Sequence, residues 1–583
     1  MHPGNPFLST YKKSPLTLDR LLEGRPIAAQ NSSLLNLPVE ILSEIVKYIE
    51  TDKSSLASLA LVNSDCRQLA RSCQFRDVLI DFSPRSSYIL GVLIREATER
   101  MRTKDRLTRR PALGACVRYM TTNLTHYWKE RKAMRPKISE GEASTDRAAF
   151  QQWMELSGNV STRIDHVYDP SLLLVITTLP HLEILDWDKV ADINPYFLDS
   201  LGASTVKHLK FEGNLDSDNM AMQLEDGASW PLLSLDIHVK WDFGYRWERE
   251  TVDASPFWNG LFQACCSTLR ILKCTHIQIH RREDKAISFN AHFPHLQFLF
   301  IQYDMPISQP SLISLLQSPR LSTLVINIGD SITVNAMDQV GYLRSLETLV
   351  WNGVNLPATL SLRSLEHNSQ LKKFGILWSQ SPSLLERIVP ALTSCYNLKT
   401  LSLIWDEKII SSVTLMSLSR LSSLEELHIS AGHQTGWRHN WFVDHNAIRN
   451  ILAPLRKLKI FLISRDSYQI NKQLPNAEEN SYYDYRVPSG DDYIEFMEQQ
   501  QSADDGQVID SLHDVWEKLH LRRMTQQAEK YAAVFLELQW IYIGQLVFTF
   551  RQCPDGQQVT VSSSAERKPD FPIYETLFGV WSK

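Results

Sequence analysis

Large apolar residues return along most of the chain with the spacing L-x-x-L-x-L. Eleven segments fit this pattern with conservative replacements. They begin at Leu182, Val206, Leu232, Leu269, Leu296, Leu321, Leu346, Leu371, Leu398, Leu424 and Leu458. The gaps between successive starts are 24, 26, 37, 27, 25, 25, 25, 27, 26 and 34 residues. A pattern that returns at such an interval predicts a repeat architecture.

Within each segment the apolar residues alternate, so they point to one side of a short strand. One repeat cannot bury that side alone, but stacked repeats with helices packed outside form a continuous core. Most of the gaps fall in the range of roughly 20–29 residues that leucine-rich repeats have. The two long gaps indicate insertions in loops, and the asparagine or cysteine of the full consensus is mostly absent. We therefore predict an α/β fold: an irregular leucine-rich-repeat solenoid, shaped as a horseshoe.

The residues between the leucines would project from the opposite, concave face of that solenoid. In the first repeats they are charged, for example Asp186, Lys210 and Asp236. In later repeats they become an apolar strip, which we predict to bind a target protein: Phe298, Phe300, Val325, Val350, Leu377 and Ile404. Apolar residues exposed together usually mark an interaction site. The alternative is that a C-terminal segment such as 465–510 folds back over the strip, and the sequence leaves both open.

Ahead of the repeats, apolar residues follow helical spacing instead. Val39, Leu42, Ile45, Val46 and Ile49 predict a first helix after Pro38, because proline is tolerated in the first turn of a helix. A second helix is expected from about residue 54, and a third over about 64–71. Three helices in about forty residues enclose only a small core, so such a unit gains stability by docking onto a neighbour or partner.

The residues of this stretch resemble an F-box of the fungal type. The resemblance rests on Leu37-Pro38-x-Glu40-Ile41-Leu42 and on the segment from Ser58 to Ala70, although Asp65-Cys66-Arg67 stands where the family often has a tryptophan. It implies a substrate-recognition subunit of an SCF-type E3 ubiquitin ligase, which binds a Skp-type adaptor and through it a cullin-RING ligase. The matching positions imply these adaptor-binding residues: Leu37, Pro38, Ile41, Leu42, Ile45, Leu59 and Val62. Several of them could instead form the core of the unit. The alternative function is a leucine-rich-repeat interaction scaffold without any ligase.

The C-terminal part of the chain breaks the repeat. A helix over about 508–534, a strand over 535–543, and alternating runs at 545–552 and 558–562 predict a final repeat and a β-hairpin that caps the sheet edge. The predicted organisation has five parts: a flexible arm at 1–33, the F-box at 34–76, the solenoid at 77–464 with a loop insertion at 138–165, an acidic loop insertion at 465–510, and the final repeat with its cap at 511–583.

Composition and charge add few alternatives. The net charge of −5 over 583 residues, with 43% hydrophobic and 22% charged residues, gives no reason to expect nucleic-acid or membrane partners. We interpret the basic stretch 95–137 as a solvated surface rather than a nucleic-acid patch. Eight cysteines without a CxxC pair predict free thiols in a reducing compartment, cytoplasmic and/or nuclear. No nucleotide, metal or nucleophile motif is present, so we expect no cofactor and no catalytic activity.

Overall fold

The structure is a computed structural model, and it describes these residues: 16–27, 32–103, 112–124, 129, 169–192, 200–215, 229–241, 255–278, 286–302, 305–432, 441–468, 512–552, 559–563, 568 and 571–579. The predicted insertion at 138–165 and nearly all of the predicted acidic insertion at 465–510 lie outside them. The chain forms two compact units. The first unit comprises Met1–His295 with Asp304–Ile307, and the second comprises Leu296–Tyr303 with Ser308–Lys583.

In the described part of the first unit, helices come first and strands follow. Its elements are α2 (Leu18–Leu21), α3 (Val39–Ile49), α4 (Lys53–Val62), α5 (Ser64–Gln74), β1 (Asp77–Ile80), α6 (Pro84–Arg102), η2 (Leu113–Cys116), β2 (Tyr119–Asn123), α9 (Asp169–Thr178), β3 (Ile184–Asp192), β4 (His208–Leu215), β5 (Ser234–Trp241), α11 (Ser255–Cys265) and β6 (Ile271–Gln278). Strands β1 to β6 pair in chain order, all parallel.

The second unit repeats a strand and a helix. Its elements are β7 (Phe298–Ile301), α12 (Gln309–Leu316), β8 (Thr323–Ile326), α13 (Ser331–Val340), β9 (Thr348–Trp351), α14 (Arg363–Glu366), β10 (Lys373–Ile376), α15 (Pro382–Ala391), η5 (Leu392–Ser394), β11 (Thr400–Ile404), α16 (Ser412–Leu418), β12 (Glu426–Ser430), β13 (Trp441–Phe442), α17 (His445–Leu452), β14 (Ile460–Ser464), β15 (Asp466–Ser467), α19 (Leu512–Val534), β16 (Trp540–Ile543), β17 (Leu546–Gln552), β18 (Val559–Ser563) and α20 (Ile573–Phe578).

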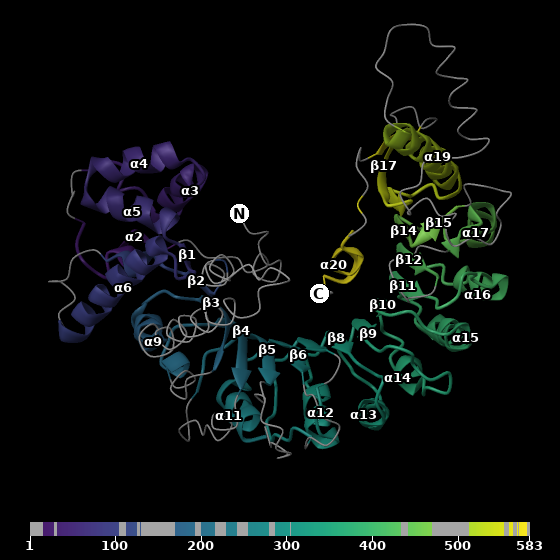
Figure 1. Ribbon diagram of the computed structural model, residues 1–583, viewed down its shortest axis with the longest axis horizontal. Coiled ribbons are helices and arrows are strands. Elements are labelled where there is room, and N and C mark those ends of the chain that lie inside the picture. Colours follow the sequence, from purple (N-terminus) through teal and green to yellow (C-terminus); the bar gives the residue numbers. More distant parts are fainter. Residues whose placement is uncertain are drawn as a thin grey trace, which may run out of the picture. The chain divides into compact units, whose positions relative to one another are not determined.

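In this unit the strands from β7 to β12, then β14 and β16, are parallel neighbours. Strands β17 and β18 add an antiparallel hairpin at the end of the sheet. Figure 1 shows α13 to α17 along one side of these strands and α20 on the other side. The result is the architecture of a repeat solenoid, and a hairpin stands where the sequence predicted one.

All eleven L-x-x-L-x-L segments contain a strand, β3 to β12 and β14. The central leucines at 299, 324 and 349 are fully buried on the helix side of the sheet. Burying a leucine side chain stabilises the fold by about 1.5–3 kcal/mol. The repeat spacing therefore predicted the strands because, within each unit, every repeat places these residues in a shared core.

The prediction of a flexible arm at 1–33 is wrong for residues 16–27, which fold onto the helices that follow. Thr17 caps α2 by accepting a hydrogen bond from the backbone N–H of Arg20 at 3.3 Å. Leu18, Leu21 and Leu22 are 5% exposed or less and share a core with Leu35, Leu42 and Leu69. A helix of four residues is too short to produce a visible periodicity, so its leucines were not recognisable as core residues.

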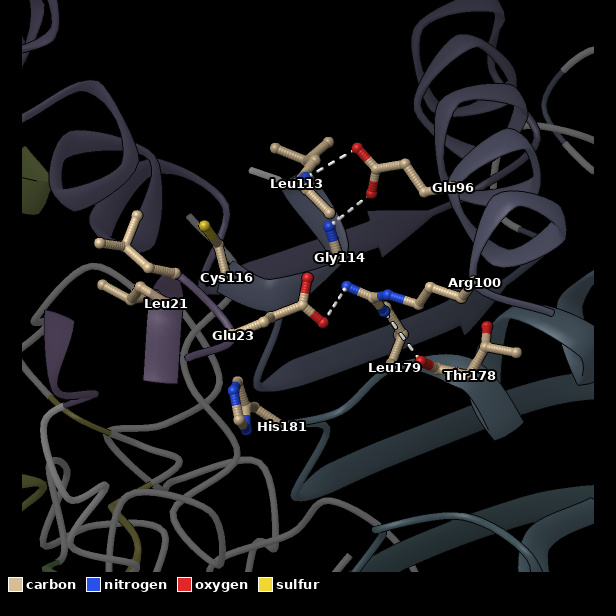
Figure 2. A network of polar contacts seen from close by, with 12 residues as sticks. Leu21, Glu23, Glu96, Arg100, Leu113, Gly114, Cys116, Thr178, Leu179 and His181 are labelled. Atoms are coloured by element: carbon tan, nitrogen blue, oxygen red, sulfur yellow. Dashed lines mark hydrogen bonds and ion pairs between the residues drawn. The ribbon is translucent and has the colours of Figure 1, made fainter. Parts of the chain in front are cut away.

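Two charged residues of α6 contact the segment after α2, the η2 turn and α9 (Figure 2). The carboxylate of Glu96 accepts hydrogen bonds from the backbone N–H groups of Leu113 and Gly114, at 2.7 and 2.8 Å. Arg100 pairs with Glu23 at 3.0 Å and donates to the carbonyl of Thr178 at 2.8 Å. These contacts hold the segment after α2, the η2 turn and α9 against one helix.

We expect Glu96→Gln to destabilise the first unit by about 1–3 kcal/mol, because an amide supplies one acceptor where two backbone N–H groups need one each. Glu99→Gln is the control, since Glu99 lies on the same helix with its side chain exposed. Chemical denaturation followed by circular dichroism measures both variants. Equal stability of the two variants would contradict the structural role of the Glu96 carboxylate.

Candidate protein-docking surfaces

The seven residues predicted to bind an adaptor fall into two groups. Ile41, Ile45 and Val62 are 50%, 38% and 66% exposed, and Pro38 is exposed with Leu37 half-buried beside it. In contrast, Leu42 is 4% exposed within the core of the helical unit, and Leu59 packs against that core. The structure therefore assigns Leu42 and Leu59 to the interior of the unit and leaves the others available to a partner.

Two further apolar residues on the same helices are exposed and were not predicted. Tyr48 on α3 is 90% exposed, and Leu61 on α4 is 81% exposed. Tyr48 lies seven residues after Ile41 and three after Ile45, so all three fall on one side of α3. That spacing could have identified Tyr48 from the sequence. We call Ile41, Ile45, Tyr48, Leu61 and Val62 the exposed apolar set.

The helices that carry this set are fixed by capping side chains and one ion pair. Asp52 caps α4 by accepting from the N–H of Ser54 at 2.9 Å. Asn63 both ends α4 and caps α5, accepting from the N–H of Cys66 at 2.7 Å. Glu50, just after α3, pairs with Arg76 at 2.8 Å. Because side chains cap the N-terminal ends of α4 and α5 and the ion pair fixes the residue after α3, the exposed apolar set is presented on a defined helical framework.

Elsewhere, the six residues predicted for target binding do come together in the second unit. Phe300, Val325, Val350 and Ile404 belong to one buried cluster, and Phe298 and Leu377 pack against it. The strand register places three of them in a single row across the sheet, which we call the central row. In full it consists of Phe300, Val325, Val350, Gly375, Ser402, His428, Leu462 and Tyr542.

The strip is not open, because α20 covers it. Tyr574, Leu577 and Phe578 of α20 are 9%, 0% and 8% exposed and complete the cluster. At about 1.5–3 kcal/mol for each buried side chain, the contact is worth roughly 5–9 kcal/mol before the cost of ordering the segment. The sequence left open whether this strip is exposed or covered. In the structure it is covered, and the described segment that covers it is α20.

Polar groups fix the position of α20. The hydroxyl of Tyr574 donates to the carbonyl of Ile376 at 2.6 Å, and it accepts from Ser402 at 3.4 Å. The ammonium of Lys373 donates to the carbonyl of Leu577 at 2.5 Å, which places a positive charge at the C-terminal end of the helix, where the helix dipole favours it. The contact is thus directional as well as apolar.

Gly375 and His428 shape the middle of the central row. A Cβ atom at Gly375 would lie 2.6 Å from the ring of Phe578, so only glycine leaves room for that ring. His428 is hydrogen-bonded to Ser402 at 2.7 Å and to Ser464 at 2.8 Å, and its ring meets Tyr574 edge to face, with centroids 6.2 Å apart. Burial, with a further contribution from Arg465, lowers the pKa of His428 to about 3.

The corresponding face in the first unit carries charge instead. Asp186, Lys210, Asp236 and Lys273 occupy one register row with alternating sign. Lys210 and Asp186 approach to 3.4 Å. Burial raises the pKa of Asp236 and lowers that of Lys273. The alternation lets neighbouring strands compensate one another, as expected for charges on a partly buried sheet face.

Metal-ligating side chains are dispersed over the part of the chain that the structure describes. Within it, no three His, Cys, Asp or Glu side chains are grouped so that they could hold a metal ion. Nor does any described helix combine the length and apolar character needed to cross a membrane. The neighbouring thiols of Cys265 and Cys266 are free, and burial raises the pKa of both, which disfavours the reactive thiolate.

Comparisons with known proteins identify no family for this chain. No protein-family model and no curated protein matches it. Among solved structures, a crystal structure of a TLR13–ssRNA13 complex is similar to 52% of this chain at 18% identity, with a TM-score of 0.28. The chain spans about 45% of that protein. A similarity this low carries no argument, so the fold rests on the repeat spacing and the strand order.

We expect the stability of the second unit to fall between pH 7 and pH 5. The unfolded chain protonates His428 below a pKa of about 6.5, whereas the folded chain keeps it neutral down to about pH 3. The unfolded state therefore binds more protons in this window, and stability is lost as the pH falls. The loss from this group is about 2 kcal/mol between pH 7 and pH 5.

The matched variant is His428→Gln, whose amide reaches the same serines without titrating. Chemical denaturation at pH 7, 6 and 5 should show a smaller loss for the variant than for the natural chain. His445, whose pKa is also lowered to about 3 by burial, contributes equally to both and cancels in the difference. An identical pH dependence of the two chains would contradict the neutral state of buried His428.

Proposed function

We propose that this chain is the substrate-recognition subunit of an SCF-type ubiquitin ligase. In this proposal α3 to α5 form the F-box and bind a Skp-type adaptor, while the leucine-rich repeats bind a target protein. The observation that carries it is the exposed apolar set on α3 and α4. Solvent-exposed isoleucine, tyrosine, leucine and valine on two short helices are typical of a surface that a partner covers.

The interior of the same helical unit supports the proposal. Leu42, Leu59 and Leu69 contribute to a core with α2, and the buried amide of Gln68 donates to the carbonyl of Ala112 at 2.7 Å. The inner faces of the helices are therefore already occupied. The exposed apolar set is left for a separate protein. Tyr48 belongs to that set, and tyrosine is one of the residue types enriched among interface anchors.

The chemistry of such a subunit is proximity rather than bond making. A target held on the repeats would share one assembly with the ubiquitin-conjugating enzyme that the cullin-RING part recruits. Confining two reactants in one assembly raises their effective concentration, and so the rate of transfer to a target lysine. No side chain of this chain then needs to act as an acid, a base or a nucleophile.

We expect Ile41→Asp combined with Leu61→Asp to weaken binding of a purified Skp-type adaptor at least about tenfold, since two charges would be buried at the interface. Tyr88→Asp is the control, because Tyr88 is 72% exposed on α6 and lies outside the set. Pulldown and calorimetry with the full chain measure the binding. If the natural chain does not bind the adaptor, the non-ligase scaffold is the better function.

Leu42→Ala separates the core role from the binding role. We expect it to destabilise the helical unit by about 2–5 kcal/mol through the cavity that it creates. Ile41→Asp should change the stability by well under that amount, because Ile41 is half exposed. Thermal denaturation of the two variants makes the comparison. A stable Leu42→Ala variant that has lost the adaptor would assign Leu42 to the interface instead.

A further inference from the structure

We propose that the site covered by α20 is the target-binding site of the repeat array, and that α20 occupies it in place of the target. The partner that fits is a short helix carrying an aromatic residue followed, three and four positions later, by leucine and a second aromatic residue. This inference rests on the proposed function, since it identifies what the repeats recognise. We call Gly375, Ser402 and His428, which are residues of the central row that contact α20, together with Lys373 the α20 seat.

The α20 seat has the features of a recognition site rather than of a uniform apolar core. Phe578 lies over a glycine whose missing side chain provides the space. The hydroxyl of Tyr574 meets an acceptor and a donor, Ile376 and Ser402. Lys373 meets the C-terminal end of the helix. A bound segment that lacked the matching groups would leave these polar atoms buried without a hydrogen-bond partner. The free-energy cost of such unpaired groups makes the site selective.

The contact is also separable from the fold beneath it. The leucines that hold the repeats together lie on the other face of the sheet and are fully buried there, as at 324, 349 and 401. The strands under α20 pair with one another through their own backbones. Removing α20 therefore uncovers one face of the sheet and leaves the helix-side core in place.

Helix α20 itself is short and depends on the site. It has six residues, far below the length at which an isolated helix is stable in water. Pro572 precedes it, and Gly579 ends it in the left-handed conformation at φ 65°. Thr576 faces solvent. A segment of another protein with the same three buried residues would make the same contacts, and α20 competes with it only through its covalent attachment.

The covalent attachment of α20 determines how strongly it competes with a partner peptide for the site. A segment linked to its own site by a short connection has an effective concentration in the millimolar range. A partner peptide of micromolar affinity would therefore bind the natural chain about 100-fold or more weakly than a chain whose α20 cannot occupy the site. The difference between the two is the measurable signature of the proposal.

The experiment compares full-length chains with a fluorescent synthetic peptide of residues 568–583 as the probe. Leu577→Asp with Phe578→Asp removes α20 from the site, and Thr576→Asp, at an exposed position of the same helix, is the control. We expect the double variant to bind the peptide in fluorescence polarisation, and the natural chain and the control to bind it at least about 100-fold more weakly. Adding Gly375→Val to the double variant should abolish binding, because it fills the space for the ring.

Peptide variants test the stated chemistry. Replacement by alanine at the positions of Tyr574, Leu577 or Phe578 should weaken binding at least about tenfold, and replacement at Glu575 should change it less than twofold. A double variant with a native circular-dichroism spectrum that does not bind the peptide would overturn the proposal. So would binding that is indifferent to Gly375→Val or to the three peptide positions.

A second route covers the case in which the double variant does not fold. A protease site placed between Ser563 and Lys568 of the natural chain frees α20 after folding. The labelled peptide should then exchange with the freed segment, and failure to exchange would contradict the proposal.

A concentration-dependent dimer of the natural chain that the double variant loses would assign the site to a second copy and also overturn it. The peptide assays contain no adaptor, so peptide binding without adaptor binding would remove the ligase function alone.

Discussion

A parallel sheet has two faces to cover, and in this chain the repeat supplies helices for only one of them. The requirement follows from the backbone, because successive side chains of a strand point to opposite sides. The leucines of each repeat take the helix side. The residues between them must be charged and compensated, covered by another segment, or bound by a partner. Much of what distinguishes the two units follows from which solution each one uses.

The first unit uses charge on this face. Asp186, Lys210, Asp236 and Lys273 alternate in sign across four strands, so each desolvated group has a neighbour of opposite charge. The second unit uses apolar residues, and among the described residues their cover is short: α20 with the adjoining Phe571. A sheet face closed by so small an element is held by specific contacts rather than by a large buried area. That is why the space at Gly375 and the hydrogen bonds of Ser402 and Lys373 contribute more to this contact than the small area they bury.

The sequence predicted the strands well and the cover poorly, for a physical reason. A period of about 25 residues repeated eleven times is a strong signal, and it also predicted that Phe300, Val325 and Val350 share a face. Helix α20 repeats nothing and has too few residues to show a helical period. The segment that completes the cluster could only be recognised once the chain was folded. The sequence offered 465–510 as an alternative cover, and nearly all of that segment lies outside the described residues.

The same contrast, between a regular pattern and a short segment that repeats nothing, explains which residues of α3 are exposed. Periodicity predicted an amphipathic helix, but it does not say which apolar residues turn inward when both sides carry them. Leu42 and Val46 pack with α2, an element that the sequence did not reveal, and this leaves Ile41 and Ile45 outside. The four-residue helix α2 therefore decides which face of α3 is available to a partner. Glu96 and Arg100 in turn hold the segment beside α2 in place.

Both candidate docking surfaces thus depend on short segments that pack against longer elements. Helix α2 fills the inner side of the F-box-like helices and so determines the exposed apolar set. Helix α20 fills the central row and so determines what could replace it. Short helices have little stability of their own, and each is present only because its leucines or aromatic rings are buried. A partner that buries the same kinds of side chain must compete with the high effective concentration that covalent attachment gives α20, whereas α2 is protected by the ion pair and hydrogen bonds around it. Under the proposed function the two surfaces would therefore differ in kind: the adaptor surface would be preformed, and the target surface would become available by exchange.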